Sequence, residues 1–172
     1  MSLEDLIASE TTEQEFLRAH QVPALLIAFP EESEEAARDV GMHTEIFSST
    51  MIQASLGEAD AALLRSSRLE WLQKSDRNPF SNLIMIGRAR TNDIVLANPG
   101  VSKVHATFSQ LNGEWQVQDG RARNGTYLNG EQLEPGGKRK LEDGDGLGFG
   151  GRVVARFLSP ASVWSYVQQL RR

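Results

Sequence analysis

The sequence predicts a mainly β fold, a sandwich or barrel, with an α/β extension before it and a helix after it. Three observations lead to this class. Between residues 81 and 158 the chain consists of short apolar runs separated by turn-forming residues, a pattern typical of all-β domains. The dipeptide Asn-Gly, which is favoured in tight hairpin turns, occurs three times in this stretch. Helix-capping sequences occur on both flanks.

The N-terminal flank begins with a helix signal. Thr12 and Glu15 have the spacing of a capping box, in which each side chain accepts a hydrogen bond from the backbone N–H of the other residue. We expect this helix to end near His20. The acidic run at 31–40, which is followed by Gly41, is a further helix candidate.

Residues 51–75 fit either a helix around 59–65 or a strand around 69–72. From there on, strand patterns dominate. Trp115 and Val117 alternate with polar residues, which indicates a strand with one buried and one solvated face. The predicted strands are the runs LIMIG (83–87), DIVLA (93–97), VHATFSQL (104–111), EWQVQD (114–119), TYLNG (126–130), LGFGG (147–151) and RVVARFL (152–158).

The C-terminal segment predicts a helix. Ser159 is a favourable N-cap, and Pro160 suits the first helical position because its missing N–H would have no partner there. At helical spacing, one face carries three apolar residues, Val163, Val167 and Leu170.

Composition limits the class of protein. The chain has 172 residues and no cysteine, which excludes disulfides and thiolate zinc sites and favours a reducing compartment. The longest apolar stretch, at 23–30, is too short to span a bilayer, and the acidic N-terminus is unlike a signal peptide. We therefore expect a cytoplasmic protein with no membrane association.

The charge is distributed unevenly along a chain of net charge −5. Residues 1–80 contain 6 Lys/Arg and 15 Asp/Glu, residues 81–150 contain 8 of each, and residues 151–172 contain 4 and none. This acidic balance argues against a nucleic acid as partner, because such surfaces carry a basic excess. A single phosphate group remains compatible with it, since a few well-placed donors suffice.

Such donors occur in the predicted loops. Arg88 follows a glycine at the end of an apolar run, Ser102 and Lys103 stand in the sequence SKVH, and Asn124 offers an amide to a peptide backbone. Arginine, lysine and hydroxyl groups are the side chains that bind a phosphorylated residue.

Five segments in order resemble the forkhead-associated (FHA) domain family: GR, NDIVL, VSKVHA, RNGTYLNG and LEDGDGLGFG. The resemblance covers residues 83–158 and implies an antiparallel β-sandwich. It places the first strand or strands upstream, in ALLIAF or around 69–72. We expect three parts: 1–80, an N-terminal extension with helices and the first sandwich strand or strands; 81–158, the sandwich core; and 159–172, a C-terminal helix packed on the core.

The resemblance also implies residue roles. Arg88 and Ser102 match phosphate-contacting positions, Lys103 adds charge, and Asn124 matches the residue that holds the ligand's main chain. Arg123 stands where the family often has Ser or Thr; we count it among the phosphopeptide-binding residues, because Arg121 and Arg123 could both supply charge from this loop. The supporting residues are Gly87 and Gly125, required by tight turns, His105, which braces the loops, and Thr126.

Together these features predict a noncatalytic module that binds phosphothreonine in a partner protein, in kinase signalling or complex assembly. FHA domains belong to the readers that use arginine clusters. No enzyme activity, cofactor or metal site is expected: the glycine-rich run at 146–151 precedes a strand instead of a helix, and EDGDG at 142–146 suits a hairpin turn better than a calcium loop. A phosphate-independent scaffold with the same fold is the alternative, and the oligomeric state stays open.

Overall fold

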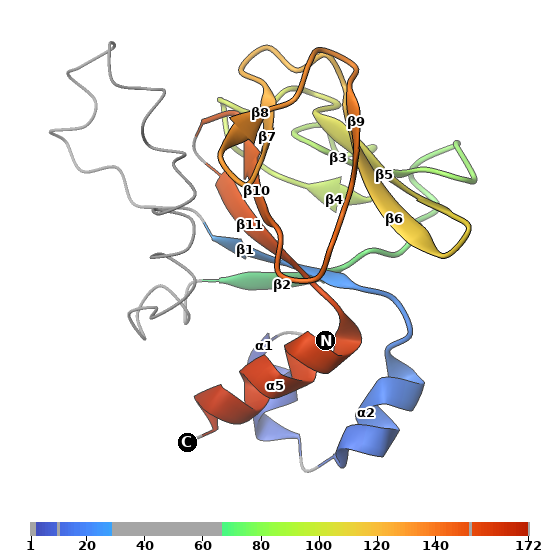
Figure 1. The fold of residues 1–172 in the computed structure, drawn as a ribbon, viewed down its shortest axis with the longest axis vertical. Coiled ribbons are helices and arrows are strands. Elements are labelled where there is room, and N and C mark those ends of the chain that lie inside the picture. The colour runs from blue at the N-terminus through green and yellow to red at the C-terminus, as the bar shows by residue number, and fades with distance from the viewer. Residues whose placement is uncertain (1–2, 10, 29–66, 152, 172) are drawn as a thin grey trace, which may run out of the picture.

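The computed structural model describes residues 3–9, 11–28, 67–151 and 153–171. Their strands form two facing sheets (Figure 1). One sheet has the order β2-β1-β11-β10-β7-β8 and the other β4-β3-β5-β6-β9. The strands are β1 (Ala24–Ala28), β2 (Arg68–Trp71), β3 (Ile84–Gly87), β4 (Ile94–Val95), β5 (Ala106–Leu111), β6 (Glu114–Asp119), β7 (Thr126–Leu128), β8 (Glu131–Gln132), β9 (Lys138–Lys140), β10 (Gly146–Phe149) and β11 (Val153–Leu158). The mainly β class predicted from the sequence is confirmed.

Both candidate upstream strands are present. β1 pairs with β11 in antiparallel register, with Ala24 opposite Leu158, and β2 adds to the outer side of β1, with Ala24 also opposite Trp71. The strand around 69–72 is therefore confirmed. The helix candidates at 31–40 and 59–65 lie outside the described residues.

The main core lies between the two sheets. Phe108 from β5 and Phe149 from β10 are fully buried there. Burial of a side chain of this size contributes about 1.5–3 kcal/mol. Val117 is buried in the same core and Trp115 is half-buried against it, as their alternation predicts.

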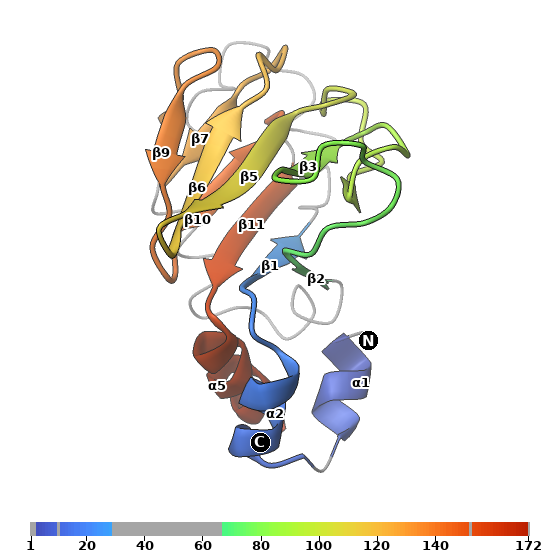
Figure 2. The ribbon, with the colours of Figure 1, turned by 90° about the vertical axis from the view of Figure 1, so that its right-hand side faces the viewer.

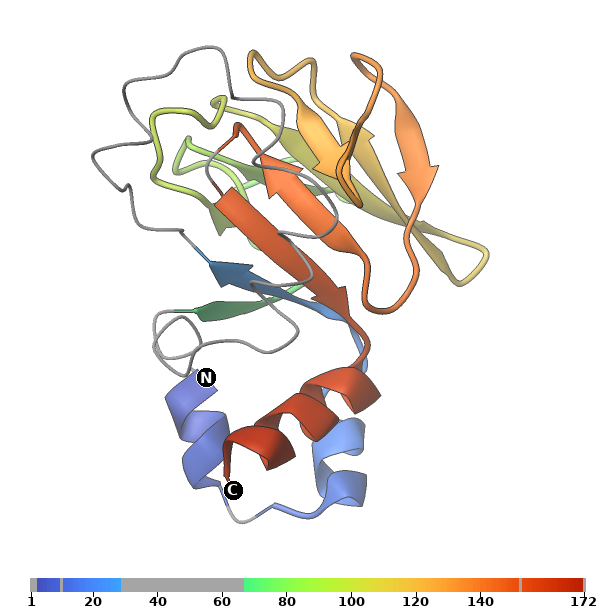
Figure 3. The ribbon, with the colours of Figure 1, turned by 60° about the vertical axis from the view of Figure 1, so that its left-hand side comes forward.

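Three helices, α1 (Leu3–Ala8), α2 (Glu13–Ala19) and α5 (Pro160–Leu170), form a second layer beneath the sandwich (Figures 2 and 3). They pack on the outer face of β1 and β11: Phe16 and Val163 share an apolar cluster with Leu26 and Val154. None of the described helices is long and apolar enough to span a bilayer.

The predicted caps are confirmed. Thr12 accepts a hydrogen bond from the backbone of Glu15, whose carboxylate accepts one from the backbone N–H of Thr12 (2.9 Å), and His20 caps the end of α2. Ser159 is the N-cap of α5, where its hydroxyl accepts from the backbone N–H of Ser162 (3.2 Å).

Replacing Ser159 with alanine is expected to lower the free energy of unfolding by about 1 kcal/mol, since the first turn of α5 loses its cap. The exposed Ser165, in the middle of the same helix, provides the matched control. Its replacement by alanine should be neutral or slightly stabilising, because alanine is the better helix former. Urea unfolding of both variants measures the difference; equal effects would contradict a capping role.

Two strands and one turn differ from the sequence analysis. β8 and β9 were not predicted, because each is a short strand at the edge of its sheet. Their residues are polar and exposed, so apolar and polar side chains do not alternate along them. The EDGDG segment does turn the chain, with the Asp145 N–H bonded to the Glu142 carbonyl (3.1 Å). It is not a hairpin, however: the turn leads from β9 in one sheet to β10 in the other.

Candidate functional site

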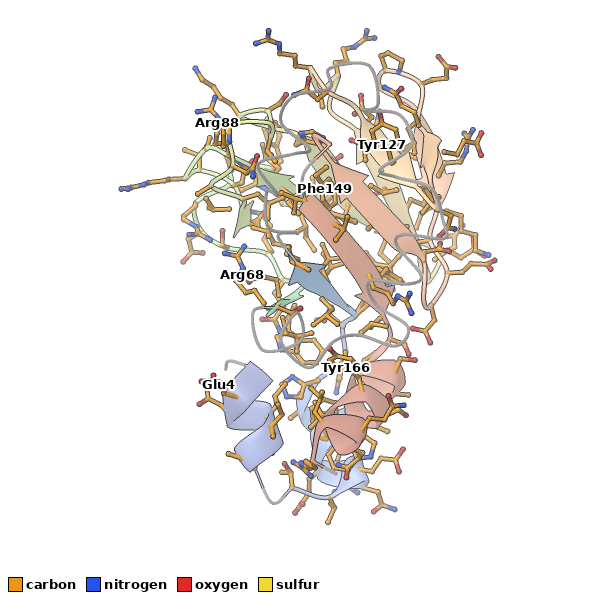
Figure 4. All side chains as sticks on the ribbon, turned by 90° about the vertical axis from the view of Figure 1, so that its left-hand side faces the viewer. Glu4, Arg68, Arg88, Tyr127, Phe149 and Tyr166 are labelled. Carbon is orange, nitrogen blue, oxygen red and sulfur yellow. The ribbon has the colours of Figure 1, made fainter. Side chains whose placement is uncertain are left out.

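The loops that carry the predicted site residues meet at one end of the sandwich. Arg88 lies at this end, and Glu4 on α1 lies at the opposite end of the molecule (Figure 4). Backbone contacts described below join these loops to one another. The segments involved are 88–93, 96–105, 120–125 and 150–151.

The end of β3 and the following loop contact the segment that contains Ser102 and Lys103. The backbone N–H of Arg88 donates to the Ser102 carbonyl (2.9 Å), and that of Ala89 donates to the Lys103 carbonyl (3.1 Å). Gly87 permits this approach, because a Cβ there would lie 2.5 Å from the Lys103 oxygen. The predicted tight-turn role of Gly87 is wrong: it lies within β3, and its φ is not left-handed.

Arg88 is exposed, and its Nε donates to the Val101 carbonyl (3.1 Å). This bond and the backbone bond to Ser102 fix the base of the side chain against the β4–β5 loop. Within the described part of the chain, the two terminal nitrogens of its guanidinium make no hydrogen bond or ion pair. Arg88 therefore presents an unneutralised cation at the loop end.

Ser102 is held from two sides. Its Oγ accepts a hydrogen bond from the backbone N–H of Arg123 (3.0 Å), and its own N–H donates to Nδ1 of His105 (3.1 Å). Because the hydroxyl oxygen acts as the acceptor, its hydrogen is free to be donated to a ligand oxygen. The bond to Arg123 also fixes the β6–β7 loop beside the β4–β5 loop.

His105 is fully buried, and its ring connects the β4–β5 loop to the β6–β7 loop. Its Nδ1 accepts from Ser102, so the neutral ring carries its hydrogen on Nε2, which donates to the Gly125 carbonyl (2.9 Å). The ring also contacts Phe149 edge to face, with centroids 5.7 Å apart. Burial lowers the pKa of His105, although the Gly125 carbonyl and the charge of Asp119 oppose that shift.

This lowered pKa predicts a pH-dependent stability. Unfolded histidine has a pKa of about 6.5, so below that value the unfolded chain binds a proton that buried His105 resists. Stability is therefore complete above about pH 6.5 and decreases as the pH falls below it, with a slope of at most about 1.4 kcal/mol per pH unit.

Urea unfolding between pH 7.5 and 5.5 measures this, in a chain with His20→Gln and His43→Gln so that His105 is the only histidine left. Adding His105→Gln should remove the slope. A flat profile while His105 is present would contradict the burial argument.

Asn124 is exposed, and its Nδ2 donates to the Gly100 carbonyl (2.9 Å). Gly100 in turn lies directly against Gly150, since a Cβ on Gly100 would be 2.6 Å from the Gly150 oxygen. Gly125 has a left-handed φ of 76°, as a tight turn requires. Asn124 is thus tied to the same β4–β5 loop as Arg88 and Ser102.

Asp119 was missed by the sequence analysis. It is 4% exposed, and Oδ1 accepts from the hydroxyl of buried Thr126 (2.7 Å), while Oδ2 accepts from the backbone N–H groups of Arg121 (2.8 Å) and Gly136 (3.2 Å). The bond from Asp119 to the N–H two residues on forms an Asx turn. An Asp-Gly pair at the end of a predicted strand was the available sequence signal.

Asn92 and Asp93 were also missed. Buried Asn92 donates to the Lys103 carbonyl (2.6 Å), so it braces the β3–β4 loop on the β4–β5 loop. The carboxylate of Asp93 is also buried, and it accepts hydrogen bonds from the Met85 N–H (2.7 Å) and from Nδ2 of Asn78 (2.6 Å). These side chains organise the loops without reaching the solvent.

The structure thus brings Arg88, Ser102, Asn124 and the backbone of Arg123 together around the β4–β5 loop. The side chains of Lys103 and Arg123 are exposed. In the described ranges they make no hydrogen bond or ion pair, and no cluster of three potential metal ligands occurs. The resulting surface combines cationic, hydroxyl and amide donors, which is the chemistry of an anion-binding site.

The fold defines a β-sandwich domain with donor-rich loops at one end, and comparison with known proteins assigns a family to part of it. Residues 84–150 match the model of the FHA domain. This segment of the chain belongs to the FHA domain family.

Curated relatives match the same part of the chain. It is 37% identical over 76 residues to an FHA domain-containing protein of Arabidopsis thaliana, covering 44% of this chain and 19% of that protein. It is 36% identical over 76 residues to the oxoglutarate dehydrogenase inhibitor of Corynebacterium efficiens, covering 44% and 51%. The chain thus spans about a fifth and about half of the lengths of these relatives.

Among solved structures, this chain is similar to that of Mycobacterium tuberculosis EmbR in complex with a low affinity phosphopeptide. The identity is 27%, the match covers 55% of this chain and 22% of that chain, and the TM-score is 0.47.

Proposed function

We propose that this chain is a noncatalytic module that binds phosphothreonine in a partner protein, in kinase signalling or complex assembly. FHA domains are among the modules that recognise phosphorylated motifs with arginine. The observation that carries the proposal is the pairing of Arg88 and Ser102 on one loop surface, each with donors left free by its structural bonds.

Each element of the site has a role in this function. A phosphorylated threonine carries a charge of about −1.5 to −2 at neutral pH and three acceptor oxygens. Arg88 and the Ser102 hydroxyl donate to these oxygens, and the Lys103 ammonium adds charge nearby. The amide of Asn124 exchanges its bond to the Gly100 carbonyl for one to the main chain of the ligand. Arg123, whose backbone N–H is bonded to the Ser102 hydroxyl, supplies a further cation.

The test is retention of degenerate peptide libraries by the immobilised protein. Phosphothreonine, phosphoserine and unphosphorylated libraries are compared at one salt concentration. We expect retention of the phosphothreonine library, weaker retention of phosphoserine and none without phosphate. Equal retention of all three, or a partner that remains bound after phosphatase treatment, would support a phosphate-independent scaffold instead.

A further inference from the structure

Arg121 has an unusual backbone conformation. Among the described residues, only three other than glycine have a positive φ: Asn112 (51°), Arg121 (57°) and Asn129 (50°). The two asparagines precede glycine in turns, and asparagine tolerates the left-handed region well. Arginine does not share this tolerance, so its presence at this position opposes folding.

The surrounding structure imposes this conformation. The buried carboxylate of Asp119 accepts the backbone N–H of Arg121 (2.8 Å), and the same oxygen holds Gly136 (3.2 Å). The other carboxylate oxygen is bonded to Thr126 (2.7 Å). Strained residues that are fixed in this way occur preferentially at ligand sites.

The side chain of Arg121 has no structural role that would justify this strain. It is exposed, and it forms no hydrogen bond or ion pair within the part of the chain that the structure describes. Its guanidinium lies beside Gly136, where a Cβ would be 3.8 Å from its Nε and Nη2. Two residues further on, the backbone of Arg123 is bonded to Ser102, so Arg121 stands at the border of the proposed phosphate site.

The charge of the loop surface also indicates a ligand contact for Arg121. Five exposed cations lie on these loops, Arg88, Arg90, Lys103, Arg121 and Arg123, and one phosphate carries at most about two negative charges. A ligand that matches this surface therefore carries further negative charge beside its phosphate. Arginine binds a carboxylate through two parallel hydrogen bonds, which adds geometric selectivity to the attraction.

We propose that Arg121 is a specificity residue that binds an aspartate or glutamate side chain of the phosphopeptide. The acidic residue lies on the side of the phosphate that faces the turn between β8 and β9, where Gly136 lies. This inference rests on the proposed function, because it assigns a second contact to the same ligand.

The first test concerns strain. Arg121→Gly and Arg121→Asn should both raise the Tm, since each replaces arginine by a residue that accepts a left-handed φ. Arg18→Gln removes a charge from an exposed position in the last turn of α2 and should not raise the Tm, because that charge interacts favourably with the helix dipole. A lower Tm for both Arg121 variants would overturn the argument from strain.

The second test concerns selectivity. Phosphothreonine libraries are prepared with one flanking position at a time fixed as Asp/Glu or as Asn/Gln. The wild type should prefer the acidic member at one position by roughly tenfold, and Arg121→Asn should abolish this preference but still bind the amide member. Arg90→Asn removes a nearby charge and should weaken binding of acidic peptides similarly at all positions.

The outcomes separate the two proposals. If the wild type binds phosphothreonine peptides without any acidic preference, or if Arg121→Asn retains the preference, the role of Arg121 is refuted and phosphothreonine binding stands. If the wild type retains no phosphopeptide, both proposals are refuted.

Discussion

Replacing Arg88 by alanine should weaken phosphothreonine-peptide binding roughly tenfold to more than a hundredfold. A hydrogen bond to a charged group contributes about 1.5–3 kcal/mol, and each 1.4 kcal/mol changes the affinity tenfold. The structural bond of the backbone N–H of Arg88 to Ser102 does not depend on the side chain, so the fold should persist. Titration of a retained phosphopeptide, followed by fluorescence anisotropy, measures the change.

Two variants make this experiment specific. Arg88→Lys keeps the charge but loses the planar donor group and the bond to the Val101 carbonyl, so its affinity should fall between those of the wild type and the alanine variant. Arg18→Ala removes an exposed arginine from α2, far from the loops, and should bind as the wild type does. An unchanged affinity for Arg88→Ala would show that the phosphate binds elsewhere.

Replacing His105 by alanine should lower the free energy of unfolding by about 2–4 kcal/mol. The change leaves a cavity beside Phe149 and removes a hydrogen-bond partner from both the Ser102 N–H and the Gly125 carbonyl. Cavity formation and the loss of buried hydrogen bonds each have costs of this order. Urea unfolding, monitored by circular dichroism at pH 7.5, provides the measurement.

Because His105 joins the loops, its loss should also weaken phosphopeptide binding at temperatures where the protein is still folded. His105→Gln puts a polar amide in place of the imidazole and should be less destabilising than His105→Ala. A loss below about 0.5 kcal/mol for the alanine variant would mean that the loops hold their arrangement without the imidazole.

The predictability of each element depended on the kind of signal it carries. The caps at Thr12 and Ser159 were predictable because capping is a local interaction within one turn. The turn at Asn112 was predictable because a positive φ is required there. Strand β9 was not, because Lys138–Lys140 form a sheet-edge strand through pairing with the neighbouring strand β6, and such pairing has no signature in the strand's own residues.

The site residues likewise fall into those that a local sequence signal predicts and those that depend on distant contacts. Arg88 and Ser102 could be proposed from short motifs, since their chemistry is carried by their own side chains. Asp119 acts through the backbone of residues near and far in the sequence, and Gly87 is required because another segment crosses it. Both properties depend on the packed loops, which no single segment of the sequence encodes.

The helical layer has a practical consequence for the study of this chain. Arg171, on the end of α5, donates to the carbonyls of Leu6, Ile7 and Ser9, so the last helix is fastened to the first. Both ends of the described structure therefore lie on the side opposite the loops (Figure 3). A tag, fluorophore or solid support attached at either end should therefore leave the loop surface accessible. Attachment to a support through either end should turn the loop surface away from that support.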